Sequence, residues 1–479
     1  MRNYAKYDGY FSLVTLTRKP AAELLADLKS GTLSAEDLMA ATLDRIEAVN
    51  GDVNAVVALR ERDDLMAEAK EKDAGRDDAG PLHALPIAVK DLVNVKGVVS
   101  SHGSPVFVNH VPEEDDLLAA RLRGAGAILI GKTNVPEFGL GSHTFNPVYG
   151  TTKNPYNTAH SAGGSSGGAA VALATGMTAL ADGSDMMGSL RNPAAWNNVY
   201  GFRPSWGLVP SESIGDTFLH QLATLGPMGR SPADIAILLD IISGADPMQP
   251  HGYDAPPFAP LAPMDPKGLK IGWLGDWGGA MPMEDGILDN AEAGLSVLRD
   301  LGCEVEPVAP PFDAEAMFDS WQTLRSWAVG AGIANLLEKK AQLKETALWE
   351  LERGLKMTAM EVHNASVVRS DWFRAAAKLF ETYDALVLPS AQVWPFEGDN
   401  EFPKEIAGKA MDTYHRWMQV TIPIGLLGLP ALAVPAGFGP HGLPMGIQIF
   451  GPRRADAKLL ALGEAYHRAT DWPGQRPAM

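Results

Sequence analysis

The stretch GGSSGGAAVALATGM, residues 163–177, joins a glycine-rich loop to an apolar segment. Glycines on both sides of Ser165 and Ser166 permit backbone angles and close approaches that other residues resist. The apolar segment fits a buried helix, and the first turn of a helix has backbone N–H groups without helical partners. Taken alone, the stretch fits a plain turn that caps a helix as well as a loop that holds a functional serine.

Short apolar runs and helical patterns alternate on both sides of this stretch. The runs that we expect to form strands are NAVVAL (54–59), PIAVKDLV (86–93), GAILIGKT (126–133), LKIGWLG (269–275), GCEVEPV (302–308), YDALVLPS (383–390), ALAVPAGF (431–438) and GIQIFG (446–451). We expect amphipathic helices over 19–50, where Ser34 and Asp37 resemble a capping box, and over 455–470. This alternation predicts an α/β fold around a mostly buried β-sheet.

The region from about 314 to 381 has a different pattern. It is helical, with few Gly or Pro breaks and with Trp321, Trp327, Trp349 and Trp372 interspersed. We expect a helical insert on the substrate side that lies over one edge of the sheet. The 479 residues contain no convincing domain linker and no internal repeat, so we expect one domain.

The bulk composition argues against several classes of protein. Forty basic residues against 58 acidic ones leave a net charge of −18, which repels phosphate backbones and anionic membranes. The first 17 residues lack the pattern of a signal peptide, and three prolines interrupt the apolar run 420–438. We therefore expect a cytoplasmic protein that binds a small molecule and neither nucleic acid nor a membrane.

Metal and disulfide chemistry find no support in the sequence. Cys303 is the only cysteine, so an intramolecular disulfide is impossible and a cysteine-based zinc site is nearly so. No HExxH, CxxC or EF-hand spacing occurs. We expect no metal and no cofactor.

Two motif matches favour other functions. GAILIGKT (126–133) fits the phosphate-loop expression GxxxxGK[ST], but the residues between its glycines have a strand pattern where a flexible loop is required. GGSSG (163–167) fits the GxSxG elbow of α/β-hydrolases, which would make Ser165 the nucleophile. That elbow needs an apolar strand immediately before the serine, whereas residues 154–161 are polar and loop-like. The elbow is retained only as a minor alternative.

Two further segments carry groups of catalytic type. Lys90 ends an apolar strand-like run; because lysine is rarely buried alone, it is either paired, for example with Asp91, or has a tuned pKa. Ser189 lies in the small-residue loop GSDMMGSLRN, between Asp185 and Arg191. On its own this loop fits an ordinary turn with an ion pair as well as it fits a catalytic serine.

Together the three segments resemble the amidase-signature family. In that family a strand lysine is followed 75 residues later by the first serine of GGSSGG, and 24 residues after that by the nucleophile; Lys90, Ser165 and Ser189 have these spacings. Flanking sequence agrees in GKTNVPEFG (131–139), GLPALAVPAGF (428–438) and GLPMGIQIFGP (442–452).

This resemblance covers most of the chain, from about Leu28 to Pro473. It implies a single amidase-signature domain over 1–479, with a signature core at about 80–210. It also implies a central twisted mixed β-sheet that is covered by helices on both faces.

The resemblance assigns the catalytic roles. Ser189 would attack the carbonyl, Ser165 would relay the proton, and Lys90 would be the base. Lysine has an ordinary pKa of about 10.4, so it can act as a base only if burial lowers that pKa by roughly 3–5 units. The relay serine of this family follows a cis peptide bond, which Gly164 makes sterically easier.

The resemblance also assigns the surrounding groups. The expected oxyanion hole consists of the backbone N–H groups of Met186, Met187, Gly188 and Ser189. The groups expected to hold the two catalytic loops are Gly164, Ser166, Asp185 and Arg191, and those expected to bind substrate are Gly139, Leu140 and Gly141. Family members usually have two glycines before the nucleophile, whereas here Met187 precedes Gly188. We expect the amides to stay inward, with Met187 packed beside the pocket.

These assignments predict hydrolysis of acyl C–N bonds other than peptide bonds through an acyl-enzyme. The substrate would be an amide, an anilide or an aryl carbamate, because some family members hydrolyse urethanes. The tryptophans Trp321, Trp327, Trp394 and Trp417 fit a broad apolar pocket, although core packing explains each of them as well. The oligomeric state is not predicted.

The main alternative is the A subunit of a glutamyl-tRNA amidotransferase, which shares the signature and works in a complex. That protein typically has RQPA after its nucleophile, whereas this chain has Arg191-Asn-Pro-Ala. The segment Pro423-Ile-Gly425 also differs from the Pro-x-Asn that is common in the family. A third possibility, a non-catalytic binding relative, conflicts with the intact Lys-Ser-Ser set.

Overall fold

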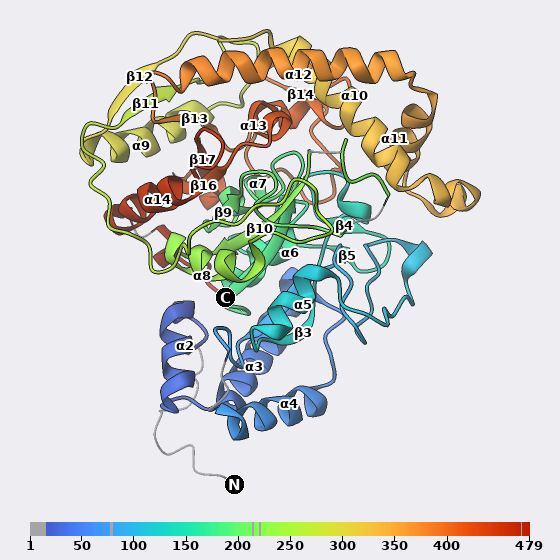
Figure 1. Cartoon of the computed structure of the whole chain (residues 1–479), viewed down its shortest axis with the longest axis vertical. Coiled ribbons are helices and arrows are strands. Elements are labelled where there is room, and N and C mark those ends of the chain that lie inside the picture. The colour runs from blue at the N-terminus through green and yellow to red at the C-terminus, as the bar shows by residue number, and fades with distance from the viewer. Residues whose placement is uncertain (1–15, 77–79, 213–214, 220–221, 471) are drawn as a thin grey trace.

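An eight-stranded mixed β-sheet forms the centre of the computed structural model of this chain (Figure 1). The structure describes residues 16–76, 80–212, 215–219, 222–470 and 472–479, so the stretch considered as a signal peptide lies almost wholly outside the described residues. The strands, in their order across the sheet, are β12 (Glu304–Pro307), β11 (Lys270–Trp273), β13 (Ala385–Pro389), β17 (Pro444–Phe450), β16 (Ala431–Phe438), β9 (Tyr200–Arg203), β10 (Thr224–Gly229) and β8 (Leu180–Asp185). Strand β11 pairs in parallel with β12 and β13, and the other pairs are antiparallel. The predicted mixed α/β fold is confirmed.

A separate three-stranded sheet lies next to β8, the last strand of the large sheet. Its strands, in order, are β1 (Val56–Val57), β3 (Ile128–Thr133) and β2 (Pro86–Lys90). Strand β2 lies beside β8, and the Lys90 backbone N–H donates to Asp182 Oδ1 at 2.9 Å. The two sheets therefore bring the end of β2 next to the strand that leads to Ser189.

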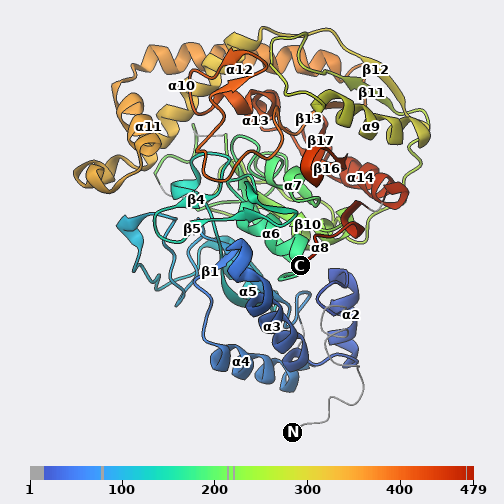
Figure 2. The ribbon, with the colours of Figure 1, turned by 180° about the vertical axis from the view of Figure 1, so that it is seen from behind.

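Helices cover both faces of the large sheet (Figures 1 and 2). On one face lie α8 (Pro232–Ile242), α9 (Ile287–Asp300) and α14 (Asp456–Thr470); on the other lie α6 (Gly167–Thr175) and α7 (Asn192–Trp196). Two adjacent residues of β17 show that these helices lie on opposite faces. Ile447 contacts Gly294 of α9, whereas Gly446 lies against Ala195 of α7. Consecutive residues of a strand point to opposite faces.

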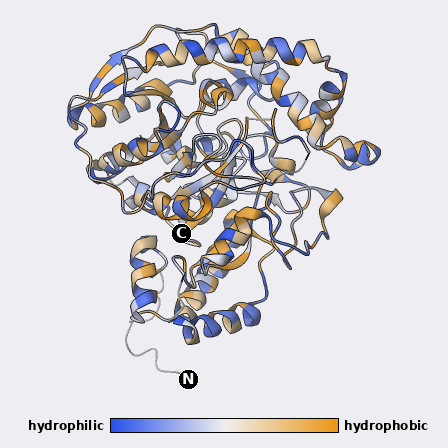
Figure 3. Ribbon diagram, viewed as in Figure 1, coloured by the Kyte–Doolittle hydropathy of each residue, from blue (hydrophilic) through white to orange (hydrophobic). Residues whose placement is uncertain are grey.

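The three-stranded sheet has its own helices. They are α3 (Ala35–Val53), α4 (Arg62–Ala74) and α5 (Leu117–Gly124), and α2 (Ala21–Ser30) lies against α8. Helices α2 and α3 confirm the prediction for 19–50, and the Ser34 side chain caps α3 by accepting the Asp37 N–H at 3.0 Å. Figure 3 shows α4 at the bottom as mostly hydrophilic, in agreement with its peripheral position.

Helix α6 begins where its backbone closely approaches that of the three-stranded sheet region. A Cβ atom on Gly168 would lie 2.3 Å from the Asn134 nitrogen and 2.6 Å from the Ala55 carbonyl oxygen, so only glycine fits here. All nine residues of α6 are buried. The loop that carries Ser165 therefore leads into a helix whose position is fixed against the three-stranded sheet.

The region 314–381 is helical, as predicted. It contains α10 (Ala314–Gly332), the 3₁₀ helix η4 (Ala334–Gln342), α11 (Glu345–Lys356) and α12 (Ala359–Leu379). Figures 1 and 2 show α10 and α12 along one rim of the molecule, near α13 (Ile422–Leu427). Trp372 of α12 is buried, and its Nε1 donates to the Pro423 carbonyl at 2.9 Å.

Some elements differ from the prediction. Strands β8, β9 and β10 of the central sheet were not expected, and the run NAVVAL forms only the two-residue strand β1. The sequence of β10, TLGPMG, has two glycines and a proline, which favour turns; pairing with β8 on one side and β9 on the other determines its conformation. The apolar run 420–438 begins at the end of the 3₁₀ helix η5 (Arg416–Thr421) and continues through α13 before it enters β16. Within the described ranges, no helix combines the length and the apolar character needed to cross a membrane.

Candidate active site

Lys90 is the last residue of β2 and is only 1% exposed. Its Nζ donates to three serine hydroxyls: Ser165 Oγ at 2.9 Å, Ser166 Oγ at 2.8 Å and Ser184 Oγ at 2.9 Å. The apolar strand carries the lysine into the interior, and the hydroxyls satisfy its polar end there.

Burial lowers the pKa of Lys90 from 10.5 to about 7. The negative charges of Asp182 and Asp185 act in the opposite direction and do not outweigh the loss of hydration. A substantial fraction of this amine is therefore neutral near neutral pH and able to accept a proton.

Ser165 lies in the glycine-rich loop before α6, after a cis peptide bond from Gly164. Two side chains hold this loop: Asn192 Oδ1 accepts the Gly164 N–H at 3.2 Å, and Thr144 Oγ1 accepts the Gly167 N–H at 3.2 Å. Ser165 Oγ meets a lysine, where an elbow nucleophile would meet a histidine.

The polar segment before this loop was predicted as loop, and that prediction is partly wrong. Residues Asn157–Ser161 form β7, which pairs with β6 (Lys153–Asn154) in a separate two-stranded hairpin. This hairpin is not part of the central sheet, so it does not supply the strand that an elbow requires.

Asp185 ends β8 and organises the loop that carries Ser189. Its buried carboxylate accepts the N–H groups of Gly188 (2.8 Å) and Leu190 (3.2 Å). Arg191 donates to it through Nε at 2.9 Å and Nη2 at 3.0 Å, and Arg203 through Nη1 at 3.1 Å. Burial alone would raise the pKa of Asp185, but the two guanidinium groups hold it well below its usual range. The carboxylate is therefore ionised, and the loop closes around it.

The structure corrects one member of the expected oxyanion hole. The Gly188 N–H is already bonded to Asp185 and does not face the pocket as a free donor. No hydrogen bond from the amides of Met186, Met187 or Ser189 occurs within the described chain. Gly188 takes the left-handed conformation, with φ +83°, whereas Met187 does not, so the methionine carries no such strain.

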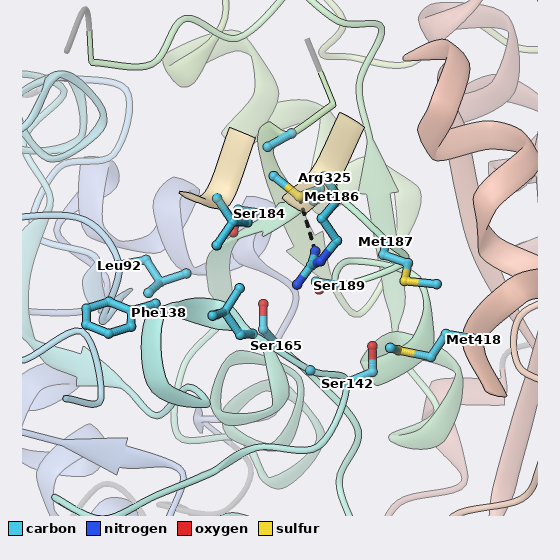
Figure 4. A pocket seen from close by; sticks show the side chains of 15 residues that line it. Leu92, Phe138, Ser142, Ser165, Ser184, Met186, Met187, Ser189, Arg325 and Met418 are labelled. Carbon is cyan, nitrogen blue, oxygen red and sulfur yellow. Dashed lines mark hydrogen bonds between the residues drawn. The ribbon is translucent and has the colours of Figure 1, made fainter. Parts of the chain in front are cut away.

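A pocket of about 160 Å³ lies over these groups (Figure 4). Its lining residues are Leu92, Phe138, Gly139, Leu140, Gly141, Ser142, Ser165, Ser184, Met186, Met187, Ser189, Ala223, Arg325, Val329 and Met418. Both catalytic serine candidates and the predicted segment 139–141 thus border one cavity. Lys90, Ser166, Asp185 and Arg191 do not line it. Lys90 donates to Ser165 and Ser184 of the wall, and Ser166 Oγ accepts the Ser184 N–H. Asp185 and Arg191 pair with each other on either side of Ser189 in the sequence.

Sequence reasoning missed several lining residues. Arg325 on α10 is the most consequential, because it brings a guanidinium group to the pocket from the helical region 314–381. No motif surrounds it; an amphipathic helix with one inward-facing arginine gives no signal that a single sequence reveals. Among the described residues, no cluster of three His, Cys, Asp or Glu side chains could hold a metal ion.

Comparisons with known proteins agree with this geometry. The sequence model of the Amidase family matches residues 37–460. The chain is 32% identical to an acylamidase of Rhodococcus erythropolis over 472 residues, covering 96% of this chain and 97% of the acylamidase. It is 31% identical to the A subunit of the glutamyl-tRNA(Gln) amidotransferase of Lysinibacillus sphaericus (strain C3-41) over 500 residues, covering 97% and 99%. It superposes on the crystal structure of a bacterial aryl acylamidase of the amidase-signature family with a TM-score of 0.90 at 28% identity, covering 97% of this chain and all of that one.

Proposed function

The chain belongs to the amidase family, and on that premise we propose that it hydrolyses acyl C–N bonds through an acyl-enzyme on Ser189. The observation that carries this proposal is the contact between Lys90 Nζ and Ser165 Oγ at 2.9 Å, made by an amine whose pKa is about 7. A neutral amine beside a hydroxyl can activate that hydroxyl, and through it a second one.

In the proposed first half-reaction, Ser189 Oγ attacks the carbonyl carbon while its proton passes to Ser165 Oγ. Ser165 gives its own proton to Lys90 Nζ, which becomes an ammonium group. The amides of Met187 and Ser189, with Met186 beside them, would stabilise the negative charge that develops on the carbonyl oxygen. When the C–N bond breaks, the proton returns from Lys90 through Ser165 to the leaving nitrogen.

In the second half-reaction, water takes the place of the leaving amine. Lys90, again neutral, accepts its proton through Ser165, and the hydroxide attacks the acyl-enzyme. Collapse of the second tetrahedral intermediate releases the carboxylic acid and returns the proton to Ser189. For a carbamate that is cleaved at its C–N bond, the released acid would be a carbonic half-ester.

We propose anilides, other aryl amides and aryl carbamates as the substrate class. Leu92, Phe138 and Met418 line the pocket together with Met186 and Met187, so its wall is largely apolar. The similarity to an acylamidase and to an aryl acylamidase supports the amide members of this class.

A glutaminase role in a tRNA amidotransferase is the second candidate, because the similarity to that enzyme's A chain is nearly as high. Gly425 argues against it. A Cβ atom at this position would lie 2.8 Å from the Met186 carbonyl oxygen, so the asparagine that is common there in the family would not fit this loop as it stands.

The test is an assay of the purified chain alone. The panel would contain 4-nitroanilides, primary amides, aryl carbamates and glutamine, with Ser189→Ala as control. We expect turnover of anilides or carbamates by the wild type and none above background by Ser189→Ala. Activity on glutamine only, or activity that requires partner subunits, would favour the amidotransferase. Undiminished turnover by Ser189→Ala would exclude Ser189 as the nucleophile.

A further inference from the structure

Arg325 brings a positively charged donor to the pocket from outside the catalytic core. It lies on α10, is 4% exposed, and lines the same cavity as Ser165 and Ser189. Figure 4 shows it among the residues that line the pocket, joined by a dashed line to Met186. The catalytic steps proposed above do not use this group.

The hydrogen bonds of Arg325 are unequal in strength. Nε donates to Glu350 Oε1 at 2.7 Å, and Nη2 donates to the Tyr414 hydroxyl at 3.2 Å. Nη1 donates to Met186 Sδ at 3.1 Å, and a thioether is a weak acceptor. Met186 also lines the cavity, so Nη1 points to a residue of the pocket wall and has the weakest of the three acceptors, although buried donors usually have strong ones.

The charge of Arg325 is already balanced. Glu350, which is fully buried, accepts from Arg325, from Tyr414 OH at 2.6 Å, from His415 Nε2 at 2.8 Å and from Ser326 Oγ at 2.6 Å. With its carboxylate so fully bonded, Glu350 cannot turn away from the arginine. The pair presents a polarised N–H group with little net charge, which suits a neutral oxygen better than a second carboxylate.

We infer that Arg325 is a specificity-determining residue that donates from Nη1 to a neutral oxygen acceptor of the substrate, a ketone, ester or ether oxygen away from the scissile bond. This inference rests on the proposed function. The substrate oxygen would replace Met186 Sδ, and methionine is flexible enough to move aside.

The surroundings of Arg325 indicate where that oxygen would lie. Val329, one turn further along α10, borders both the catalytic pocket and an adjoining hollow of about 370 Å³. Met186 borders both as well. A substrate arm that extends from Ser189 toward the larger hollow would therefore pass Arg325.

The probes are 4-nitroanilides whose acyl chain carries one ketone oxygen at successive positions, each compared with its methylene counterpart. A second series carries the oxygen on the amine arm. Because a hydrogen bond to a charged donor is stronger than a neutral one, we expect kcat/KM to favour the oxygen-bearing member by about tenfold or more at one position. The effect should appear mainly in KM. A ratio near one at every position in both series would overturn the inference without any variant.

The variants separate Arg325 from its partners. Arg325→Met alone would leave the Glu350 carboxylate buried without its countercharge, so the double change Arg325→Met with Glu350→Gln is the main variant. The double variant should still hydrolyse the methylene substrates but should lose the preference in kcat/KM for the oxygen-bearing ones. The matched control is Arg353→Met on α11; the guanidinium of Arg353 lies over the Trp349 ring. This variant should keep the turnover of the methylene substrates and also the preference for the oxygen-bearing ones. A preference that persists in the double variant would overturn the inference.

Binding to Ser189→Ala distinguishes failure of the inference from failure of the proposed function. Calorimetry with the same substrate pairs would give the ratio of dissociation constants without turnover. If the wild type hydrolyses neither member but Ser189→Ala binds the oxygen-bearing one more tightly, the proposed function fails and the inference stands. Equal binding of both members would overturn the inference.

Discussion

The amine of Lys90 is surrounded by hydroxyl groups, and these neighbours determine how readily it loses its proton. A hydroxyl both donates and accepts, so Ser165, Ser166 and Ser184 can satisfy the amine in its charged and in its neutral form. A carboxylate in direct contact would instead hold the proton on the lysine. Burial among serines thus permits the pKa of about 7.

The acid limb of the pH profile should report this pKa. The proposed base is the neutral form of Lys90, so kcat/KM should fall below pH about 7 and approach a plateau above it. The measurement is kcat/KM for a neutral anilide from pH 5 to 9, in buffers of constant ionic strength. A profile that is flat from pH 5 to 9 would contradict the assignment of Lys90 as the base.

Lys90 should also make the stability depend on pH. In the unfolded chain its pKa would be near the ordinary 10.5, whereas in the folded chain it is about 7. Between these values the unfolded state binds more protons, so the free energy of unfolding rises with pH through this window. We expect the wild type to gain stability relative to Lys90→Met as pH increases from 7 to 10, as measured by urea denaturation. A difference that does not change with pH would show that the lysine keeps its ordinary pKa in the fold.

Gly188 should not tolerate a side chain. Its φ of +83° costs another residue roughly 1–2 kcal/mol. A Cβ atom would also lie 2.6 Å from Thr421 Cγ2. We expect Gly188→Ala to lower kcat about tenfold or more, because the distortion displaces the amide of Ser189.

The control for that prediction is Gly97→Ala. Gly97 has a similar φ of +76°, but a Cβ atom there would have no neighbour within 4 Å, and the residue does not line the pocket. The variant should lose stability by a similar backbone cost and keep its kcat. Equal loss of kcat in both variants would mean that general destabilisation, and not the loop geometry, explains the effect.

At this scale the sequence predicts some residues far better than others. The spacings of 75 and 24 identify Lys90, Ser165 and Ser189 because the family keeps those distances, and the structure brings both serines to one pocket. The bond from Gly188 to Asp185 could not be predicted, since it depends on how the turn closes. Arg325 could not be predicted either, because only the packing of α10 carries it to the pocket.

Helices α10 and α11 meet through glycines, and this contact positions Arg325 and its partner Glu350. A Cβ atom on Gly354 would lie 2.2 Å from the Ser326 carbonyl oxygen and 3.0 Å from the Gly330 Cα. Residues without a side chain allow the two helix backbones to approach this closely. The salt bridge between Arg325 and Glu350, with Nε to Oε1 at 2.7 Å, joins the same two helices.

Gly354→Ala should therefore separate the two helices. Overpacking of this kind typically costs about 1–3 kcal/mol. We expect a lower melting temperature and a higher KM, because Arg325 and Val329 of the pocket wall move with α10. Thermal denaturation and steady-state kinetics provide the two measurements.

Gly51→Ala in helix α3, which borders neither the pocket nor the adjoining hollow, is the control. A Cβ atom there would have no neighbour within 4 Å, and alanine has the higher helix propensity, so we expect equal or slightly greater stability and an unchanged KM. An unchanged melting temperature for Gly354→Ala would show that the helices can adjust without cost.

At the scale of elements, periodic and apolar segments were the predictable ones. Strands β2, β3, β11, β12, β13, β16 and β17 all fall within or overlap runs expected from the sequence. Strand β10 was missed because its glycines and proline favour turns locally, while its two neighbouring strands determine its conformation. Local sequence therefore identifies elements that are stable by their own pattern, and it misses those that depend on partners far along the chain.

The candidate site requires the whole molecule. Lys90 comes from the three-stranded sheet, Ser165 from the loop before α6, Ser189 from the loop after β8, and Arg325 from α10. Substrate must reach them across a surface whose net charge is −18. The electrostatic field of this net charge acts on charged ligands, and its range is the screening length, which decreases as salt is added.

The net charge predicts how salt will affect charged substrates. An anilide with a distal carboxylate should be repelled at low ionic strength, where the screening length is about 30 Å at 0.01 M, and much less at 1 M, where it is about 3 Å. We expect kcat/KM for this anion to rise roughly two- to tenfold over that range, while kcat/KM for its neutral methyl ester changes little. The comparison of acid with ester removes general salt effects on the enzyme. If kcat/KM for the anion instead falls as salt is added, a local positive potential at the pocket outweighs the field of the whole molecule.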